Sequence, residues 1–357
     1  MNILISPGVT LAQTVGRYRT VNRLTHRIPL FACFAIVLLP VLVSARKNDA
    51  PQPPGKLVDL GGHRLHVHCS GSGRPTVVVE TGLGDFSFDW ALVQSDVSRY
   101  TRVCTYDRAG YAWSDPGPKP RTFAQINLEL HDALRQLGEK GPYVLVGHSY
   151  GGPVMINFAT IYRQDVGGLV LVDSASEGMR VGVGNKQTIR LGEGAQMRDI
   201  PAPREEMTAA DRFTPPENDP PVPTSLDSIY KSLPSEDQKL HLWAQGLPAL
   251  EDAENSQREW SEIYFAQWLS KPRDGALGDL PLLVLARADG GYSQDLDVPA
   301  AQMEQERKDA QAKLARLSKN STEVTIPTGH NMDLEAPAAV SYAIHRVVNV
   351  VRRPQPL

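Results

Sequence analysis

Five short runs of consecutive apolar residues constrain the fold of this 357-residue chain most. A strand that is buried on both faces of a parallel sheet shows such a run, because neither face meets water. The runs are TVVVE (76–80), TRVCTYD (101–107), YVLVGHS (143–149), GLVLVDS (168–174) and PLLVLAR (281–287), and EVTIP (323–327) adds one more. The sequence therefore predicts a largely parallel sheet.

Helical periodicity separates these runs. In 123–137, apolar residues recur at intervals of three and four, and Gly138 follows as a helix-ending residue. Further helices are expected over 151–162, 298–317 and 337–351. Strands that alternate with helices in this way indicate an α/β fold with right-handed crossovers.

Two regions depart from that alternation. Two short strand-like runs at 56–60 and 63–70 flank Gly61-Gly62, which predicts a hairpin. From Ser176 to Asp279 there is no buried-strand run, and the stretches SLDSIYKSL, EDQKLHLWAQGL and EDAENSQREWSEIYFAQWL indicate helices around a Pro-rich break. We therefore expect a core formed by 46–175 and 280–357, with 176–279, called the insertion below, as a helical cap or lid.

The first 45 residues have the composition of a membrane-targeting segment. They hold four arginines and no acidic residue, and the stretch 28–45 is apolar and uncharged. Val43-Ser44-Ala45 suits signal peptidase, but the apolar stretch approaches the length that spans a bilayer. The sequence leaves a cleaved signal peptide and a membrane anchor open. Either places the domain outside the cytoplasm, periplasmic or extracellular, and an uncleaved segment would contact the membrane through 28–45.

Charge and cysteine content narrow the partners. The net charge is −3 without a long Lys/Arg run in the main domain, which argues against nucleic acid and favours a small-molecule partner. No Cys/His cluster has the spacing of a zinc site, so we expect no metal and no other cofactor. Cys33 lies in the apolar stretch; Cys69 and Cys104 are expected as free thiols, with a disulfide as the alternative.

The sequence GHSYGG places Ser149 among glycines between a predicted strand and a predicted helix. This G-x-S-x-G context is typical of a sharp turn that exposes a nucleophilic serine. Serine needs a base, and in this layout the histidine follows the last strand; His330 in TGHN stands there. The expected catalytic nucleophile and base are therefore Ser149 and His330.

The site also needs an acidic residue that orients His330, and the sequence leaves a choice between aspartates at the ends of two predicted strands. Asp289 follows PLLVLAR and is preferred, whereas Asp173 ends the neighbouring run GLVLVDS and could reach the same imidazole. Asp295 and Asp297 are further options on the loop of Asp289.

Acyl transfer also requires donors for the developing oxyanion. We expect the backbone N–H of Tyr150, which directly follows Ser149, and the N–H of Leu83 in the glycine loop TGLGD after TVVVE.

Several separated motifs occur in the order found in one superfamily. GHSYGG, the glycine loop after TVVVE, YDRAGYAWSD and TGHNMDLEAP together resemble the α/β-hydrolase fold superfamily over 56–352. The resemblance implies a mostly parallel eight-stranded sheet flanked by helices, a lid after the sixth strand, and a triad of Ser149, Asp289 and His330. It assigns Asp107 and Arg108 to a segment that organises loops near the site.

Two motifs depart from the family pattern. The glycine loop begins Thr81-Gly82 where His-Gly is common, and the loop ARADGGYSQDLD is longer and more acidic than usual. Relatives that open epoxides or remove halogens carry aspartate where Ser149 stands, so the serine favours ester chemistry.

These observations predict a serine hydrolase of carboxylic esters that works through an acyl-enzyme. Amide or thioester hydrolysis and acyl transfer to an alcohol use the same groups, and a non-catalytic binding protein is the alternative of a different class. The aromatic residues of the insertion favour a largely apolar acyl substrate.

Overall fold

The computed structural model describes residues 50–183, 186–216, 223–288, 290–292 and 294–357. The predicted targeting segment, 1–45, lies outside these residues. Within the described ranges, no helix is both long and apolar enough to cross a membrane.

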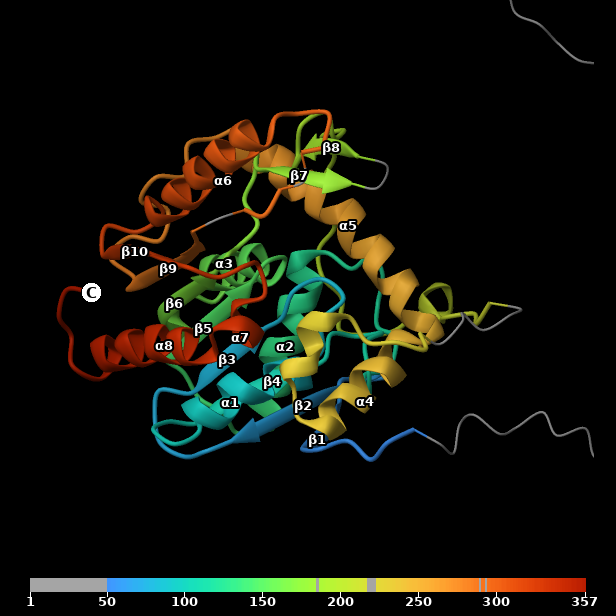
Figure 1. The fold of residues 1–357 in the computed structure, drawn as a ribbon. Coiled ribbons are helices and arrows are strands. Elements are labelled where there is room, and N and C mark those ends of the chain that lie inside the picture. The colour runs from blue at the N-terminus through green and yellow to red at the C-terminus, as the bar shows by residue number, and fades with distance from the viewer. Residues whose placement is uncertain (1–49, 184–185, 217–222, 289, 293) are drawn as a thin grey trace, which may run out of the picture. The chain divides into compact units, whose positions relative to one another are not determined.

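An eight-stranded sheet runs through the domain in the order β1-β2-β4-β3-β5-β6-β9-β10 (Figure 1). β1 and β2 pair as an antiparallel hairpin and β2 pairs antiparallel to β4, whereas the pairs from β4 to β10 are parallel. The strands are β1 (Lys56–Asp59), β2 (Arg64–Ser70), β3 (Val77–Glu80), β4 (Val103–Tyr106), β5 (Tyr143–His148), β6 (Val166–Val172), β9 (Leu282–Arg287) and β10 (Ser321–Ile326). The predicted strands and their mostly parallel pairing are confirmed.

Alternate side chains of the central strands enter two separate cores. In β5, Leu145 packs with the helices on one face, while Val144 and Val146 pack on the other. The helices are α1 (Ala91–Val97), α2 (Phe123–Gln136), α3 (Gly151–Ile161), α4 (Ser235–Gln245), α5 (Pro248–Leu269), α6 (Ala300–Ala315), α7 (Met332–Glu335) and α8 (Pro337–Arg352). Side chains of α2, α3 and α6 cover the first face, and those of α1 and α8 cover the second. Burial on both faces explains why the strands read as continuous apolar runs.

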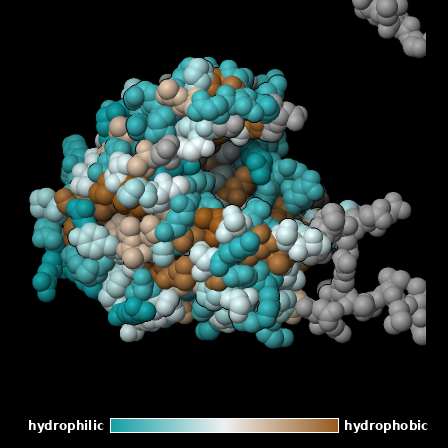
Figure 2. Space-filling view, viewed as in Figure 1, coloured by the Kyte–Doolittle hydropathy of each residue, from teal (hydrophilic) through white to brown (hydrophobic). Residues whose placement is uncertain are grey.

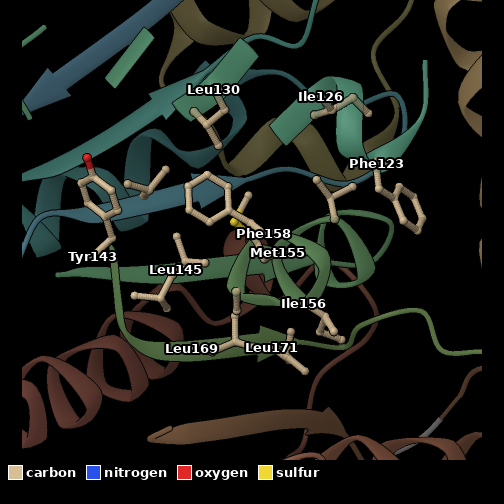
Figure 3. Packing of buried hydrophobic residues seen from close by; sticks show 14 of the residues in the cluster. Phe123, Ile126, Leu130, Tyr143, Leu145, Met155, Ile156, Phe158, Leu169 and Leu171 are labelled. Carbon is tan, nitrogen blue, oxygen red and sulfur yellow. The ribbon is translucent and has the colours of Figure 1, made fainter. Parts of the chain in front are cut away.

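Figure 3 shows the first of these cores at close range. Phe158 and Met155 of α3 lie between Leu130 of α2 and Leu145 of β5. All four side chains are fully buried. Helix α3 is therefore fixed against the sheet, and its first turn is held at the end of β5.

The insertion differs in part from the expected helical cap. α4 and α5 are present, but 225–233 forms only the short 3-10 turn η4 (Ser228–Ser232). An antiparallel hairpin, β7 (Arg180–Val183) and β8 (Gln187–Arg190), precedes them and was not predicted. Its strands are partly exposed, so the sequence has no apolar run there from which the hairpin could be predicted. Figure 2 shows a hollow below this hairpin, with hydrophobic residues in its walls.

The expectation of free thiols was wrong, because Cys69 and Cys104 form a disulfide. Cys69 of β2 and Cys104 of β4 stand opposite each other in the antiparallel register, with their Cα atoms 4.0 Å apart. Pairing of distant strands brings the two cysteines together, and their separation of 35 residues gave no sign of it.

Cys104→Ser is expected to lower the free energy of unfolding by about 3 kcal/mol, because the bond closes a loop of that length in the unfolded chain. Urea denaturation of the variant and of the oxidised protein measures the difference. The unaltered protein reduced with dithiothreitol is the control, since it loses the bond without a substitution. Equal midpoints for Cys104→Ser and the oxidised protein would contradict a stabilising role.

Candidate active site

Ser149 occupies a strained turn between β5 and α3. Its φ is +50°, a left-handed value that non-glycine residues rarely adopt. The flanking glycines make the turn possible: a Cβ on Gly147 would lie 2.5 Å from the Gly151 carbonyl oxygen, and one on Gly152 would collide with the side chain of Ser174. This crowding admits only glycine at both positions, and the turn leaves the Ser149 hydroxyl at the carboxyl edge of the sheet.

A chain of hydrogen bonds links three side chains at this edge. The Ser149 hydroxyl donates to His330 Nε2 over 3.0 Å, and His330 Nδ1–H donates to Asp173 Oδ2 over 2.6 Å. His330 follows β10, and Asp173 follows β6, the strand beside β5. Because parallel strands end at the same edge, residues 149, 173 and 330 meet although they are far apart in the sequence.

The backbone around Asp173 fixes this arrangement. Its φ is +37°, and its N–H donates to the Leu285 carbonyl of β9 over 2.8 Å. The N–H of Ser149 donates to the Val172 carbonyl, and that of Ala175 donates to the Ser149 carbonyl. The turn after β6 is therefore tied to the turn after β5.

The preferred acid, Asp289, lies outside the described residues, and the carboxylate bonded to His330 is that of Asp173. Asp295 and Asp297 are directed elsewhere: Asp295 pairs with Lys186 at 2.8 Å, and Asp297 accepts a hydrogen bond from Thr188 beside the β7–β8 hairpin. Among the described residues, the hydrogen bond to His330 thus favours Asp173, the alternative that the sequence left open, and the preference for Asp289 stays a prediction.

Two arginines surround the carboxylate of Asp173. Arg287 Nε lies 3.3 Å from Oδ2, and Arg307 Nη1 lies 4.0 Å from Oδ1. Burial raises the pKa of Asp173, but the hydrogen bond from His330 and the charges of His330 and Arg287 outweigh burial and leave the pKa below its ordinary value. Asp173 is thus a carboxylate at neutral pH and can hold His330 with Nδ1 protonated.

The His330 imidazole keeps 41% of its side-chain surface exposed. Burial of the rest lowers its pKa, the hydrogen bond to Asp173 opposes that effect, and the charge of His148 adds to the lowering. The net pKa lies below 6.5, so Nε2 is unprotonated at neutral pH and can accept the Ser149 proton.

The two expected oxyanion donors lie on two different turns at the ends of parallel strands. Tyr150 is the N-cap of α3, where backbone N–H groups lack helical partners, and Leu83 lies in the loop after β3. Arg108 fixes that loop: its guanidinium donates to the carbonyls of Thr81 (2.9 Å) and Gly82 (2.6 Å). It also forms a buried ion pair with Glu80 at 2.5 Å. The family resemblance gave Arg108 a role in organising loops near the site. In the structure, Arg108 holds the loop that carries Leu83.

A polar network around His148 lies beside the site and was not predicted from the sequence. His148, directly before Ser149, donates from Nε2 to the carbonyl of His330 over 3.0 Å. Asp85 lies beside His148 and accepts a hydrogen bond from Tyr230 of the insertion. The only signal was a histidine at the variable position of G-x-S-x-G, and nothing in the sequence showed that it is buried.

Comparison with known proteins agrees with the fold. A family model described as "Alpha/beta hydrolase family" matches residues 65–341. The chain is 36% identical over 129 residues to the probable transporter efuK of Hormonema carpetanum, an alignment that covers 34% of this chain and 18% of that protein. It is 35% identical over 121 residues to YqjL of Bacillus subtilis, covering 34% and 48%. The matched region is thus less than half of either relative.

A serine hydrolase involved in carbazole degradation, the CarC enzyme, shares the architecture with a TM-score of 0.55. The identity is 17%, and the superposition covers 83% of this chain and 98% of CarC. At this identity the likeness shows a common fold. Because the family model spans more than half of the chain, the protein belongs to the alpha/beta hydrolase family.

Proposed function

We propose that the protein is a serine hydrolase that cleaves an acyl bond, with carboxylic esters as the substrate class. Ser149 is the nucleophile, His330 the general base and acid, and Asp173 the group that orients His330. The observation that carries the proposal is the chain of hydrogen bonds from Ser149 through His330 to Asp173, at 3.0 and 2.6 Å.

The reaction proceeds in two steps through an acyl-enzyme. Ser149 Oγ attacks the acyl carbonyl while its proton moves to His330 Nε2, which then protonates the leaving alcohol. Water, activated by the same nitrogen, releases the acid and restores Ser149. The N–H groups of Leu83 and Tyr150 stabilise the negative oxygen that forms in each step. Asp173 stabilises the imidazolium and stays ionised throughout.

We infer a largely apolar acyl group from the hydrophobic side chains that the insertion and its neighbourhood leave partly exposed. Hydrophobic residues line the walls of the hollow below the β7–β8 hairpin (Figure 2). Trp243 and Trp268 of the insertion are only partly buried. An apolar chain would gain free energy by leaving water for such a surface, at about 0.8 kcal/mol per CH₂.

Labelling with a fluorophosphonate tests the proposal directly. The unaltered protein is expected to gain one phosphonyl group on the tryptic peptide that contains Ser149, because an activated serine attacks phosphorus as it attacks an acyl carbon. Mass spectrometry locates the group.

Two variants complete this test. Ser149→Ala removes the acceptor, and His330→Ala removes the base while leaving the acceptor; both are expected to remain unlabelled. Circular dichroism checks that each variant is folded. Absence of label from the folded, unaltered protein would overturn the proposed function, and label on another serine would reassign the nucleophile.

A further inference from the structure

We propose that His148 is a positioning residue for the reaction: as a buried imidazolium it holds the backbone of His330 through a hydrogen bond and keeps the His330 ring neutral. This inference rests on the proposed function, because it concerns how the base of that reaction is held. The Ser149 hydroxyl bonds the His330 ring, whereas His148 bonds the His330 backbone.

The carbonyl of His330 is the point of attachment. It accepts hydrogen bonds from His148 Nε2 and from the N–H of Met332, both over 3.0 Å. His148 ends β5, so the strand that presents Ser149 also holds the loop that carries the base. One residue therefore links the positions of nucleophile and base.

The contacts of His148 favour its doubly protonated form. Nε2 faces a carbonyl, which only accepts, so Nε2 carries a proton. Nδ1 lies 3.5 Å from Asp85 Oδ2, and an unprotonated Nδ1 would place a lone pair against a carboxylate. The other oxygen of Asp85 accepts from Tyr230 over 3.0 Å, which stabilises Asp85 as an anion. With a proton on each nitrogen, Nε2 donates to the His330 carbonyl and Nδ1–H faces the Asp85 carboxylate.

Other charges around His148 act in the same direction. Burial lowers its pKa, but the neighbouring Asp85 carboxylate and the negative charge of Asp333 raise the pKa to about 9. For Asp333, burial raises the pKa to about 7, and the charge of His148 opposes this shift. Next to them, burial raises the pKa of Asp89 to about 6, although its hydrogen bond with His241 opposes the shift. His148 is thus the cation of an acidic pocket.

This charge acts on His330. The ring centroids of His148 and His330 are 4.8 Å apart, and the buried Trp90 ring also packs near the His148 ring. A positive neighbour disfavours a second positive charge, so His148 adds to the effect of Arg287 in lowering the pKa of His330, while Asp173 opposes both. His330 consequently stays unprotonated, and able to act as a base, to a lower pH than it would alone.

His148→Gln separates the charge from the hydrogen bond. A glutamine amide can stand near the place of Nε2 and donate to the His330 carbonyl, but it carries no charge. The acidic limb of kcat/KM for p-nitrophenyl butyrate is expected to move to higher pH by about one unit, because loss of a cation raises the pKa of His330. The plateau at higher pH is expected to fall by less than about tenfold, since the base is then neutral in both proteins.

His66→Gln is the matched control. His66 is a fully buried histidine that contacts a carboxylate, Asp107, at 2.7 Å, and it belongs to β2 instead of the site. Its replacement is expected to lower stability and to leave the acidic limb in place. The inference would be overturned if the acidic limb of kcat/KM stayed at the same pH in folded His148→Gln. It would also be overturned if both variants shifted this limb equally. The proposed function would survive either result as long as the fluorophosphonate labels Ser149.

A second measurement needs no variant. Nuclear magnetic resonance of the imidazole nitrogens, with ¹⁵N-labelled histidine in the unaltered protein, follows each ring as pH changes. The signals of His148 are expected to remain those of an imidazolium beyond pH 8, while those of His330 titrate below pH 6.5. A neutral His148 at pH 7 would overturn the inference.

Discussion

Asp173→Asn is expected to slow acylation of Ser149 by about 10⁴-fold. Asp173 Oδ2 accepts the proton of His330 Nδ1 over 2.6 Å and so leaves Nε2 free to take the Ser149 proton. An asparagine amide can donate to Nδ1 instead, which favours the tautomer with the proton on Nε2. A protonated Nε2 cannot accept the Ser149 proton. Stopped-flow measurement of the burst with a p-nitrophenyl ester reports the acylation rate.

Asp289→Asn makes the matched comparison, because Asp289 was the preferred acid on the sequence. We expect its acylation rate to stay within about threefold of the unaltered protein, because Asp173 Oδ2 already accepts the proton of His330 Nδ1. Both variants should melt cooperatively. A large loss in Asp289→Asn together with a small loss in Asp173→Asn would show that the hydrogen bond to Asp173 does not orient the base in turnover.

Arg108→Met carries the second large expectation, a loss of about 3–5 kcal/mol in the free energy of unfolding. Arg108 and Glu80 are 1% and 0% exposed, and removal of the guanidinium leaves the Glu80 carboxylate buried without its counter-charge. Tyr106 also donates to Glu80, but a neutral hydroxyl cannot replace a cation. Because Arg108 holds the Thr81 and Gly82 carbonyls, labelling of Ser149 should slow as well. Urea denaturation measures the stability.

Two variants control for this loss. Arg99→Ala removes an arginine that pairs with Asp96 at the surface, and we expect no measurable change. The double variant Glu80→Gln, Arg108→Met removes both charges and is expected to regain part of the stability, because no unpaired charge stays buried. If the single and double variants were equally destabilised, the loss would come from packing and not from charge.

The central sheet was predictable because strands that are buried on both faces have continuous runs of apolar residues. Val144, Leu145 and Val146 are consecutive and apolar since alternate side chains enter different cores, and the glycines beside Ser149 reflect crowding within a few residues. Such local causes are visible without coordinates. The same holds for the helix 123–137, whose observed bounds are Phe123–Gln136.

Features that depend on which strands become neighbours were not predictable. The choice between Asp173 and Asp289 requires knowledge of which carboxylate approaches His330, and both residues follow buried strands. Cys69 and Cys104 meet only because β2 pairs with β4. The β7–β8 hairpin buries little, so its residues carry no strong pattern.

The placement of the three reacting residues separates the chemistry of the site from its choice of substrate. Ser149, Asp173 and His330 each stand just beyond the end of a core strand, whereas the chain between β6 and β9 leaves the sheet and returns to it as one continuous connection. Changes in that connection that spare the turn at Asp173 and the contact of Tyr230 with Asp85 leave the strand ends that carry these three residues in place. New substrate preferences can therefore arise by exchange of a single segment, on a chemical apparatus that stays the same.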